Sequence, residues 1–225
     1  MAKKDFSKED EQLQNVENTV SSAALWFEQN SKVISWIMFA VIAVILCIMA
    51  VNNYIIKPKA LEAGNENAKA VVYFMQSDWQ KALDGDDAEC MGFAAIADNY
   101  GLYQQGKLAA LYAGICHYKL GQYEDAAHYL KKFSADDLVI DPSAKMLLGD
   151  AYVEMGEMKK AAGCFMEAAA SKNEIIAPIA LKKAGNVYMA LDDKKAAHKV
   201  YVTIRDEYPQ SSEAGDIDKY VALTE

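Results

Sequence analysis

The stretch "LAALYAGICHYKLGQYEDAAHYLKKF", residues 108–133, reads as two short amphipathic helices joined by a polar turn. Its residue order returns in "AKMLLGDAYVEMGEMKKAAGCFMEAAA" and in "ALKKAGNVYMALDDKKAAHKVYVTIRDEYP". Aligned on Gly114, Gly149 and Gly185, the three segments follow one another at spacings of 35 and 36 residues. Self-similarity at such a period is the signature of a repeat architecture, so the chain is expected to build one unit three times over.

Within each segment the small and large residues fall at fixed places. Three residues after the glycine comes a ring (His117, Tyr152, Tyr188), and twelve after it comes an alanine (Ala126, Ala161, Ala197). A large residue follows four later (Leu130, Phe165, Tyr201), and turn residues separate the halves (Gly121, Gly156, Asp192-Asp193). Small residues let two helices approach closely, and one such hairpin cannot bury its apolar face alone. The pattern predicts helical hairpins stacked into a solenoid.

This spacing resembles the tetratricopeptide repeat, whose pattern is small at the eighth position, aromatic at the eleventh and alanine at the twentieth. Residues 107–209 are similar to three such repeats, with His117 replacing an aromatic and Asp192 replacing a turn glycine. The resemblance implies a solenoid of helical hairpins. With the apolar segment before it, described below, the expected fold is all-α: a single N-terminal transmembrane helix followed by this solenoid. Strand signals are almost absent from the sequence.

The segments on either side of the repeats are expected to extend the solenoid. Upstream, residues 61–103 read as a degenerate repeat, with Ala70, Tyr73, Trp79 and Ala82 in register. An insertion, "GDDAECMGFAAIADNYGLYQQG", lengthens it and predicts a loop with a short helix around 88–99. Residues 210–225 read as a polar-faced capping segment.

An uncharged run of 19 apolar residues, "VISWIMFAVIAVILCIMAV", begins at Val33. As a helix it would extend roughly 28 Å, about the thickness of the hydrocarbon core of a bilayer. The alternative is a buried core helix, but those are normally amphipathic and shorter. A cleaved signal peptide would begin nearer the N-terminus and end in a small-residue site. We therefore expect a transmembrane helix over residues 33–54.

The tail before the span, residues 1–32, reads as an amphipathic helix on the cytoplasmic side. Leu13, Val16, Val20, Ala24 and Phe27 fall on one face at steps of three and four residues. The tail either docks on a neighbouring membrane protein or lies along the interface, and the sequence leaves both open.

The net charge of the chain excludes one class of partner, nucleic acid. The chain carries a formal net charge of −9, all of it in residues 60–225. Nucleic-acid binding needs a basic stripe, so it is not expected. Four lysine pairs, at 131–132, 159–160, 182–183 and 194–195, are interleaved with acids and are expected to form a solvated face.

No catalytic, metal or cofactor motif stands out. The histidines 117, 128 and 198 are far apart in the repeat alignment, and none pairs at i, i+4 with another His or a Cys. Cys116 and His117 are adjacent, but neighbours on one helix diverge by about 100°. Cys90, Cys116 and Cys164 lie in helical-core contexts and no CxxC occurs. We expect no enzyme, no catalytic residues, no metal and no cofactor, with a thiol enzyme as a remote alternative.

A solenoid of this kind binds other proteins. In tetratricopeptide proteins the exposed positions of the first helices line a concave groove. Carried onto this sequence, the partner-binding positions are Tyr118, Met146, Asp150, Val153, Asn186 and Met189. They are mostly uncharged, which favours a permissive groove over a clamp for a charged terminus. The alternative is that part of this stripe packs on the upstream repeat or on a dimer partner.

The layout of the chain resembles the bacterial ancillary subunits of the protein-export translocon. The likeness lies in "EQLQNVENTV", in "WFEQNSK" before the single span, and in "FAAIADNYGLYQQGKLAALYAGICHY". It implies an inner-membrane protein with a periplasmic solenoid, working with secretion-channel subunits, periplasmic chaperones or exported chains. "YVTIRDEYPQSSEA" also resembles repeats of envelope-assembly and division-coordination proteins, so a structural adaptor there is the alternative function.

The charges beside the span favour the opposite orientation. Lys32 stands before it, whereas Lys57, Lys59 and Lys69 follow it. Counted by the positive-inside rule, these lysines place the solenoid in the cytoplasm. Long domains translocate largely regardless of such charges, and we expect the periplasmic orientation that the family layout implies.

Overall fold

The computed structural model describes residues 26, 29–86 and 89–225. The five residues of the predicted apolar face of the tail, from Leu13 to Phe27, lie outside the described residues. The fold is all-α, as the sequence predicts, apart from one pair of two-residue strands. The chain divides into two compact units, residues 1–57 and 58–225, each of which is described by itself.

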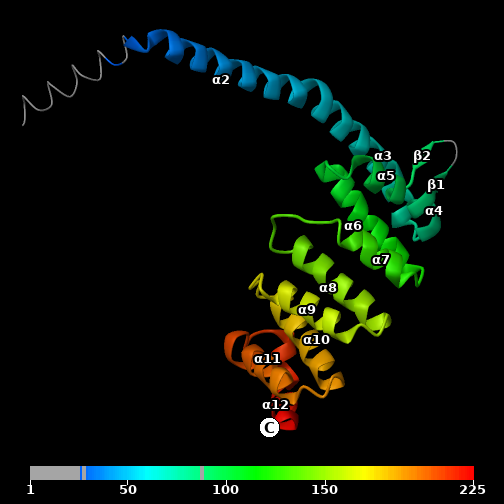
Figure 1. The fold of residues 1–225 in the computed structure, drawn as a ribbon. Helices are drawn as coiled ribbons and strands as arrows, with labels where there is room; N and C mark the ends of the chain where they lie inside the picture. Colours follow the sequence, from blue (N-terminus) through cyan, green and yellow to red (C-terminus); the bar gives the residue numbers. More distant parts are fainter. Residues whose placement is uncertain (1–25, 27–28, 87–88) are drawn as a thin grey trace, which may run out of the picture. The chain divides into compact units, whose positions relative to one another are not determined.

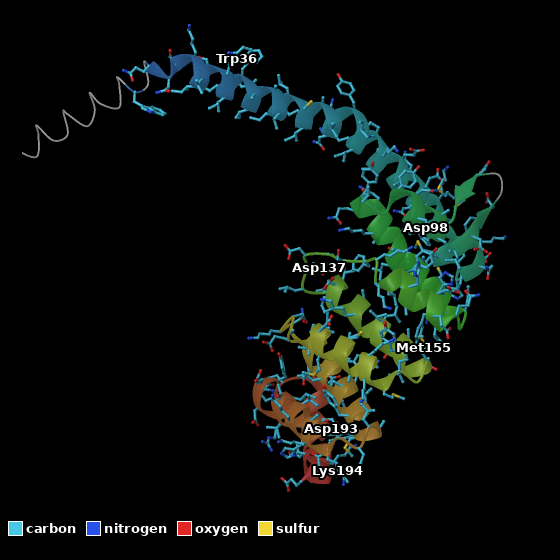
Figure 2. The ribbon with its side chains drawn as sticks, in the orientation of Figure 1. Trp36, Asp98, Asp137, Met155, Asp193 and Lys194 are labelled. Carbon is cyan, nitrogen blue, oxygen red and sulfur yellow. The ribbon has the colours of Figure 1, made fainter. Side chains whose placement is uncertain are left out.

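The first unit contains helix α2, Ser31–Val51, followed by a π-helical turn, Asn52–Ile56. Its side chains are exposed all round; Trp36, which stands out from the helix in Figure 2, is 76% exposed. Among the described residues one helix is long and apolar enough to cross a membrane, and it contains this segment. An apolar helix with no protein around it needs another apolar environment, which a bilayer supplies.

The π-helical turn ends two residues before Pro58. A proline has no amide hydrogen and its ring displaces the carbonyl four residues earlier, which here belongs to Tyr54. The amide of Lys57 instead bonds to the carbonyl of Asn52, five residues back. Such a single wide turn is a common way for a helix to accommodate an interruption of its hydrogen-bond ladder.

The second unit is a succession of antiparallel helical hairpins (Figure 1). Its first part comprises α3 (Lys57–Met75), α4 (Trp79–Asp84), strands β1 (Gly85–Asp86) and β2 (Cys90–Met91), and α5 (Phe93–Tyr100). Three hairpins follow: α6 (Gln104–Lys119) with α7 (Tyr123–Leu130), α8 (Ile140–Glu154) with α9 (Met158–Ala169), and α10 (Ile176–Ala190) with α11 (Lys194–Glu207). A 3₁₀ turn (Ser212–Asp216) and α12 (Ile217–Thr224) end the chain.

In each of the three hairpins, the glycine of the first helix lies against a large side chain of the second helix. A Cβ added to Gly149 would lie 2.6 Å from the Phe165 ring, and one added to Gly185 would lie 2.3 Å from the Tyr201 ring. At Gly114 the obstructing atom is Cγ of Leu130, again at 2.6 Å. The large residue of the second helix therefore fills the space that the missing side chain leaves on the first helix. This contact explains why the glycine and the large residue recur at a fixed spacing in the sequence.

The turns between paired helices repeat one backbone conformation. Gly121 and Gly156 have φ of 75° and 73°, and Asp192 takes the same left-handed region at 58°. In each turn the next amide bonds back to the ring-bearing residue of the first helix, as from Gln122 to His117 at 2.9 Å. This is the Schellman ending of a helix, which favours glycine because φ is positive.

The upstream helices α3 and α4 are joined by the same turn. Ser77 has φ of 61°, and the amide of Asp78 bonds to the carbonyl of Tyr73 at 3.0 Å. Ala70 and Ala82, the small residues of the predicted register, are both fully buried. A repeat-like hairpin therefore forms here without a turn glycine.

The insertion departs from its prediction in one respect. Its helix is α5, but β1 and β2 form an antiparallel pair before it. The sequence did not predict these strands. Two glycines make this possible: Gly85 has φ of 84°, and a Cβ on Gly92 would lie 2.1 Å from the carbonyl oxygen of Leu83. Close backbone approach, rather than alternating β-branched residues, builds these strands.

The last hairpin is covered by the end of the chain. Ile217 and Val221 of α12 are buried against α11, in a cluster with Tyr201 and Ile204. Asp216 accepts a hydrogen bond from Lys182 at 2.6 Å and pairs with Lys219 at 2.8 Å. Bonds from these two lysines lower the pKa of Asp216 to about 2. Residues 210–225 thus lie where a capping segment would be needed.

We predict that Gly156→Ala lowers the free energy of unfolding by about 1 kcal/mol, because an alanine at positive φ is strained. No atom lies within 4 Å of the added Cβ, so the effect is one of backbone conformation. Gly163→Ala is the matched control. It also meets no atom but lies inside α9 at ordinary φ, and should stabilise by about 0.5–1 kcal/mol. Urea unfolding of the full chain in detergent, followed by circular dichroism, measures both. Equal effects of the two substitutions would contradict the assigned turn.

A second prediction concerns the stability of the fold at low pH. Because its folded-state pKa is lowered, Asp216 contributes stability above its ordinary pKa of about 4 and loses it as the pH falls toward 2. Asp216→Asn should therefore flatten the fall in unfolding midpoint between pH 4 and pH 2. A pH profile identical to that of the unsubstituted chain would show that the two lysines do not hold this carboxylate.

Candidate functional site

The six predicted partner-binding residues lie along the first helices of the three hairpins. Tyr118, Met146 and Val153 are partly buried against one core cluster, and Met189 packs against the next. Asn186 is exposed, but its Oδ1 accepts a hydrogen bond from the Tyr201 hydroxyl at 3.1 Å. Part of the surface of these residues is therefore used for contacts within the hairpin stack.

Asp150 is bonded to a lysine of the next hairpin. Its two carboxylate oxygens accept bonds from Nζ of Lys183 at 2.7 and 2.9 Å, linking α8 to α10. Burial, followed by the negative charge of Asp150, raises the pKa of the Tyr118 hydroxyl. This part of the stripe is a fixed polar contact between neighbouring hairpins.

Three members of the lysine pairs do more than solvate a face. Lys183 bonds to Asp150, Lys182 to Asp216, and Lys132 to Asp98 of α5 at 2.7 Å. The first pair joins two hairpins, the second joins α10 to the 3₁₀ turn after α11, and the third joins the segment after α7 to α5. Partly exposed ion pairs of this kind contribute little to stability.

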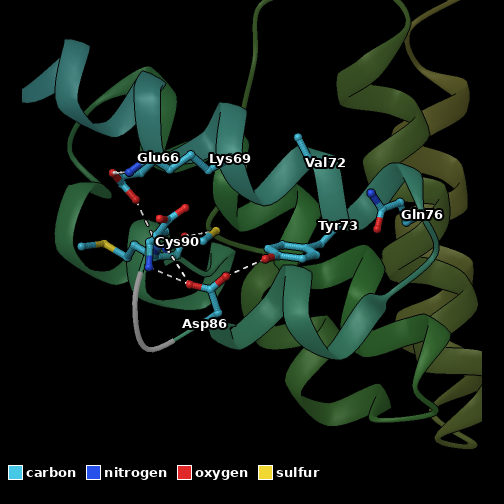
Figure 3. Close-up of a pocket in the computed structure, with 9 residues that line it drawn as sticks. Glu66, Lys69, Val72, Tyr73, Gln76, Asp86 and Cys90 are labelled. Carbon is cyan, nitrogen blue, oxygen red and sulfur yellow. Dashed lines mark hydrogen bonds and ion pairs between the residues drawn. The ribbon is translucent and has the colours of Figure 1, made fainter.

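The insertion builds a pocket that the sequence did not reveal (Figure 3). Tyr73 of α3 donates its hydroxyl hydrogen to Asp86 at 2.5 Å, and Glu66 accepts from the amide of Met91 at 3.0 Å. The other oxygen of Asp86 accepts from the amides of Glu89 and Cys90, at 2.7 and 3.1 Å. Two side chains of α3 thus hold the strand pair against the helix.

The space between α3 and the strands is an open hollow of about 1000 Å³. Its lining combines apolar and acidic side chains with one lysine: Glu66, Lys69, Val72, Tyr73, Gln76, Asp86, Glu89, Cys90 and Met91. The lining contains three carboxylates and one lysine, and that lysine, Lys69, pairs with Glu66 at 2.7 Å. The hollow is suited to a side chain or segment that is apolar and cationic.

Cys90, which lines this hollow, is not in surroundings that activate a thiol. It is buried, and desolvation followed by the negative charges of Asp86 and Glu66 raises the pKa of its thiol. A thiol acts as a nucleophile through its thiolate, which these surroundings disfavour. The arrangement supports binding rather than covalent chemistry.

The remaining thiols of the second unit are no more reactive. Burial raises the pKa of Cys116 to about 12 and that of Cys164 to about 11. His117, beside Cys116 in sequence, bonds through Nδ1 to Gln122 at 2.7 Å and stacks on Tyr129. Among the described residues no three His, Cys, Asp or Glu side chains gather in a metal-ligand arrangement.

Two features of the sequence were partial signals of the pocket. The spacing of 44 residues between the in-register Ala70 and Gly114, against 35 and 36 later, marked an insertion. The carboxylates of "DDAEC" were visible, but acids are common in turns for other reasons. Nothing in the spacing showed that Tyr73 and Glu66 would bond to the inserted strands.

Comparison with known protein families matches residues 108–136 to the tetratricopeptide repeat, a stretch that contains most of α6 and all of α7. No curated protein matches the chain. The match therefore identifies the kind of hairpin at the centre of the second unit.

We predict that Tyr73→Phe loosens the strand pair, because Asp86 loses its bond to the helix. Hydrogen exchange of the full chain in detergent should show the amides of Glu89, Cys90 and Met91 exchanging about five- to thirtyfold faster, which corresponds to a bond worth about 1–2 kcal/mol. Tyr103→Phe, also a partly buried tyrosine of this part of the fold, is the control and should leave them unchanged. Unchanged exchange in Tyr73→Phe would mean that the strands are held without this bond.

Proposed function

We propose that the chain is a non-catalytic, membrane-anchored scaffold that binds other proteins through its helical hairpins. The stacked hairpins carry the proposal, because tetratricopeptide units serve protein binding and one hairpin matches that family. The long apolar helix supports single-pass anchoring. Desolvation raises the pKa of the buried thiols of Cys90 and Cys116 and of the partly buried thiol of Cys164, which argues against the thiol-enzyme alternative.

More specifically, we propose an ancillary subunit of the protein-export translocon in the inner, cytoplasmic membrane. In this proposal residues 1–32 are cytoplasmic, 33–54 cross the membrane, and the hairpins lie in the periplasm. Residues 61–103, 107–209 and 210–225 then form a degenerate repeat, three full repeats and a cap. The partners are secretion-channel subunits, periplasmic chaperones or exported polypeptides. The layout described for the sequence supports this assignment.

The partner surface in this proposal is the stripe of Tyr118, Met146, Asp150, Val153, Asn186 and Met189. Val153 and Met189 keep part of their apolar surface open, so an extended chain can lie against them. The adaptor function in envelope assembly or division is favoured by a different observation. Asp150 is already bonded to Lys183, so this part of the surface is rigid and better suited to one fixed partner helix.

Site-specific photocrosslinking in the native membrane tests both functions. With the crosslinker at Val153 or Met189 of the full chain, we expect capture of channel subunits or exported chains. Position 166 in α9 is the control, since Met166 is apolar and 36% exposed but lies on a second helix. Capture of division or cell-wall proteins alone would contradict the translocon assignment, and equal capture from position 166 would contradict the assigned surface.

A further inference from the structure

Helix α3 has one buried face and one bare one. Ala63, Asn67 and Ala70 are buried, in contact with the rest of the second unit; Asn67, for instance, donates to the carbonyl of Gln105 at 2.8 Å. The opposite face consists of Leu61, Asn65, Ala68, Val72 and Met75, all of them exposed. Leu61 is 67%, Val72 52% and Met75 80% exposed. Among the described residues nothing covers this apolar face.

The two ends of the hairpin stack differ in this respect. At the C-terminal end, α12 buries Ile217 and Val221 on the last hairpin. At the other end α3 has no such neighbour within the described part of the second unit, and its large apolar side chains remain in contact with solvent. A stack of hairpins needs a polar outer face at each end to remain soluble. An apolar one points to an interaction surface.

The spacing of the bare residues specifies the kind of neighbour. From Leu61 to Met75 the steps are four, three, four and three, the a/d pattern of a coiled coil. Leu61, Ala68 and Met75 then occupy d positions, and Asn65 and Val72 occupy a positions. A β-branched residue at a favours two strands, and a single asparagine at a fixes the register of a dimer. The face is therefore patterned for a second, parallel helix of the same spacing.

The membrane anchor decides between possible occupants. If α2 spans the bilayer, the tail before it lies on the opposite side from α3 and cannot reach this face. A second copy can, because the same anchor would hold both chains in one membrane with their second units on the same side. Leu61 is only ten residues beyond the end of α2, so the chain keeps it within about 35 Å of that point. Anchoring thus supplies a high effective concentration to a seam of only two heptads.

Charge also favours a second copy at this place. Residues 60–225 together carry −9, so most surfaces of two copies repel each other. Between Lys59 and Met75 the charges balance, with Lys59 and Lys69 against Glu62 and Glu66. This is a face at which two acidic units can approach without a large electrostatic penalty.

We propose that two copies of the chain associate in the membrane through α3, parallel and in register, with Leu61, Asn65, Ala68, Val72 and Met75 along the seam. The proposal depends on anchoring by α2 and not on the identity of the client. It leaves the stripe on the first helices of the later hairpins open for that client.

Disulfide crosslinking of the full-length chain in membranes tests the seam. In a background of Cys47→Ala and Cys164→Ala, Leu61→Cys and Met75→Cys should each crosslink to the same position of the other copy, at least fivefold more than the control Leu138→Cys. Leu138 is 64% exposed, a fraction similar to the 67% of Leu61, but it lies in the loop before α8. Crosslinking at Ala68→Cys alone would indicate antiparallel helices and overturn the proposal. So would crosslinking at Leu61→Cys and Met75→Cys no stronger than at Leu138→Cys.

The mass of the full chain in detergent gives a second test that does not use cysteine. Leu61→Glu with Met75→Glu should convert a dimer to a monomer with helix content unchanged, since both side chains are exposed and support no core. The matched control is Leu138→Glu with Ile175→Glu, two exposed apolar residues of other loops, which should remain dimeric. Loss of the dimer in both variants, or in neither, would place association on another surface and overturn the proposal.

Discussion

The close approach of a glycine on one helix to a large side chain on its partner is the contact on which the second unit depends. Phe165 and Tyr201 occupy the space above Gly149 and Gly185 so tightly that no Cβ fits between. The contact brings the paired helices together and leaves the outer faces of each hairpin to pack on the next. Core clusters then follow one another along the stack, sharing residues such as Met146 and Tyr188. The stacking of the hairpins is the consequence of one contact made repeatedly.

This contact also explains how much the sequence could predict. A glycine, a ring, an alanine and a second large residue at fixed spacing are visible without coordinates, and the hairpins over 104–207 have helices at those places. The turn at Asp192 was predicted from its position even though glycine is replaced there. The strands at Gly85–Asp86 and Cys90–Met91 were missed, because a backbone contact at Gly92 and single bonds from Tyr73 and Glu66 form them. Contacts of that kind leave no periodicity.

The predicted binding stripe shows what cannot be learned by assigning binding residues from the positions of a family pattern. A family pattern gives the face on which a residue lies, but it does not say whether another helix already uses that residue. Asp150 of α8 is bonded to Lys183 of the next hairpin, and Asn186 of α10 is bonded to Tyr201 of its own hairpin. The pocket beside α3 and the bare face of that helix were absent from the pattern, since each arises where the repeat is interrupted or ends. The surfaces that we propose for partners therefore lie both on the later hairpins and at the N-terminal end of the stack.

A double-mutant cycle on Gly149 and Phe165 tests the central contact most directly, because all three nearest atoms to the added Cβ belong to the Phe165 ring. With Phe165 present, Gly149→Ala should cost about 1–3 kcal/mol in the free energy of unfolding, from overpacking. In a Phe165→Ala background the same substitution should instead stabilise the protein by about 0.5–1 kcal/mol, because alanine is the better helix former. This reversal of sign is the result that the close glycine–aromatic contact predicts. An equal cost in both backgrounds would contradict it.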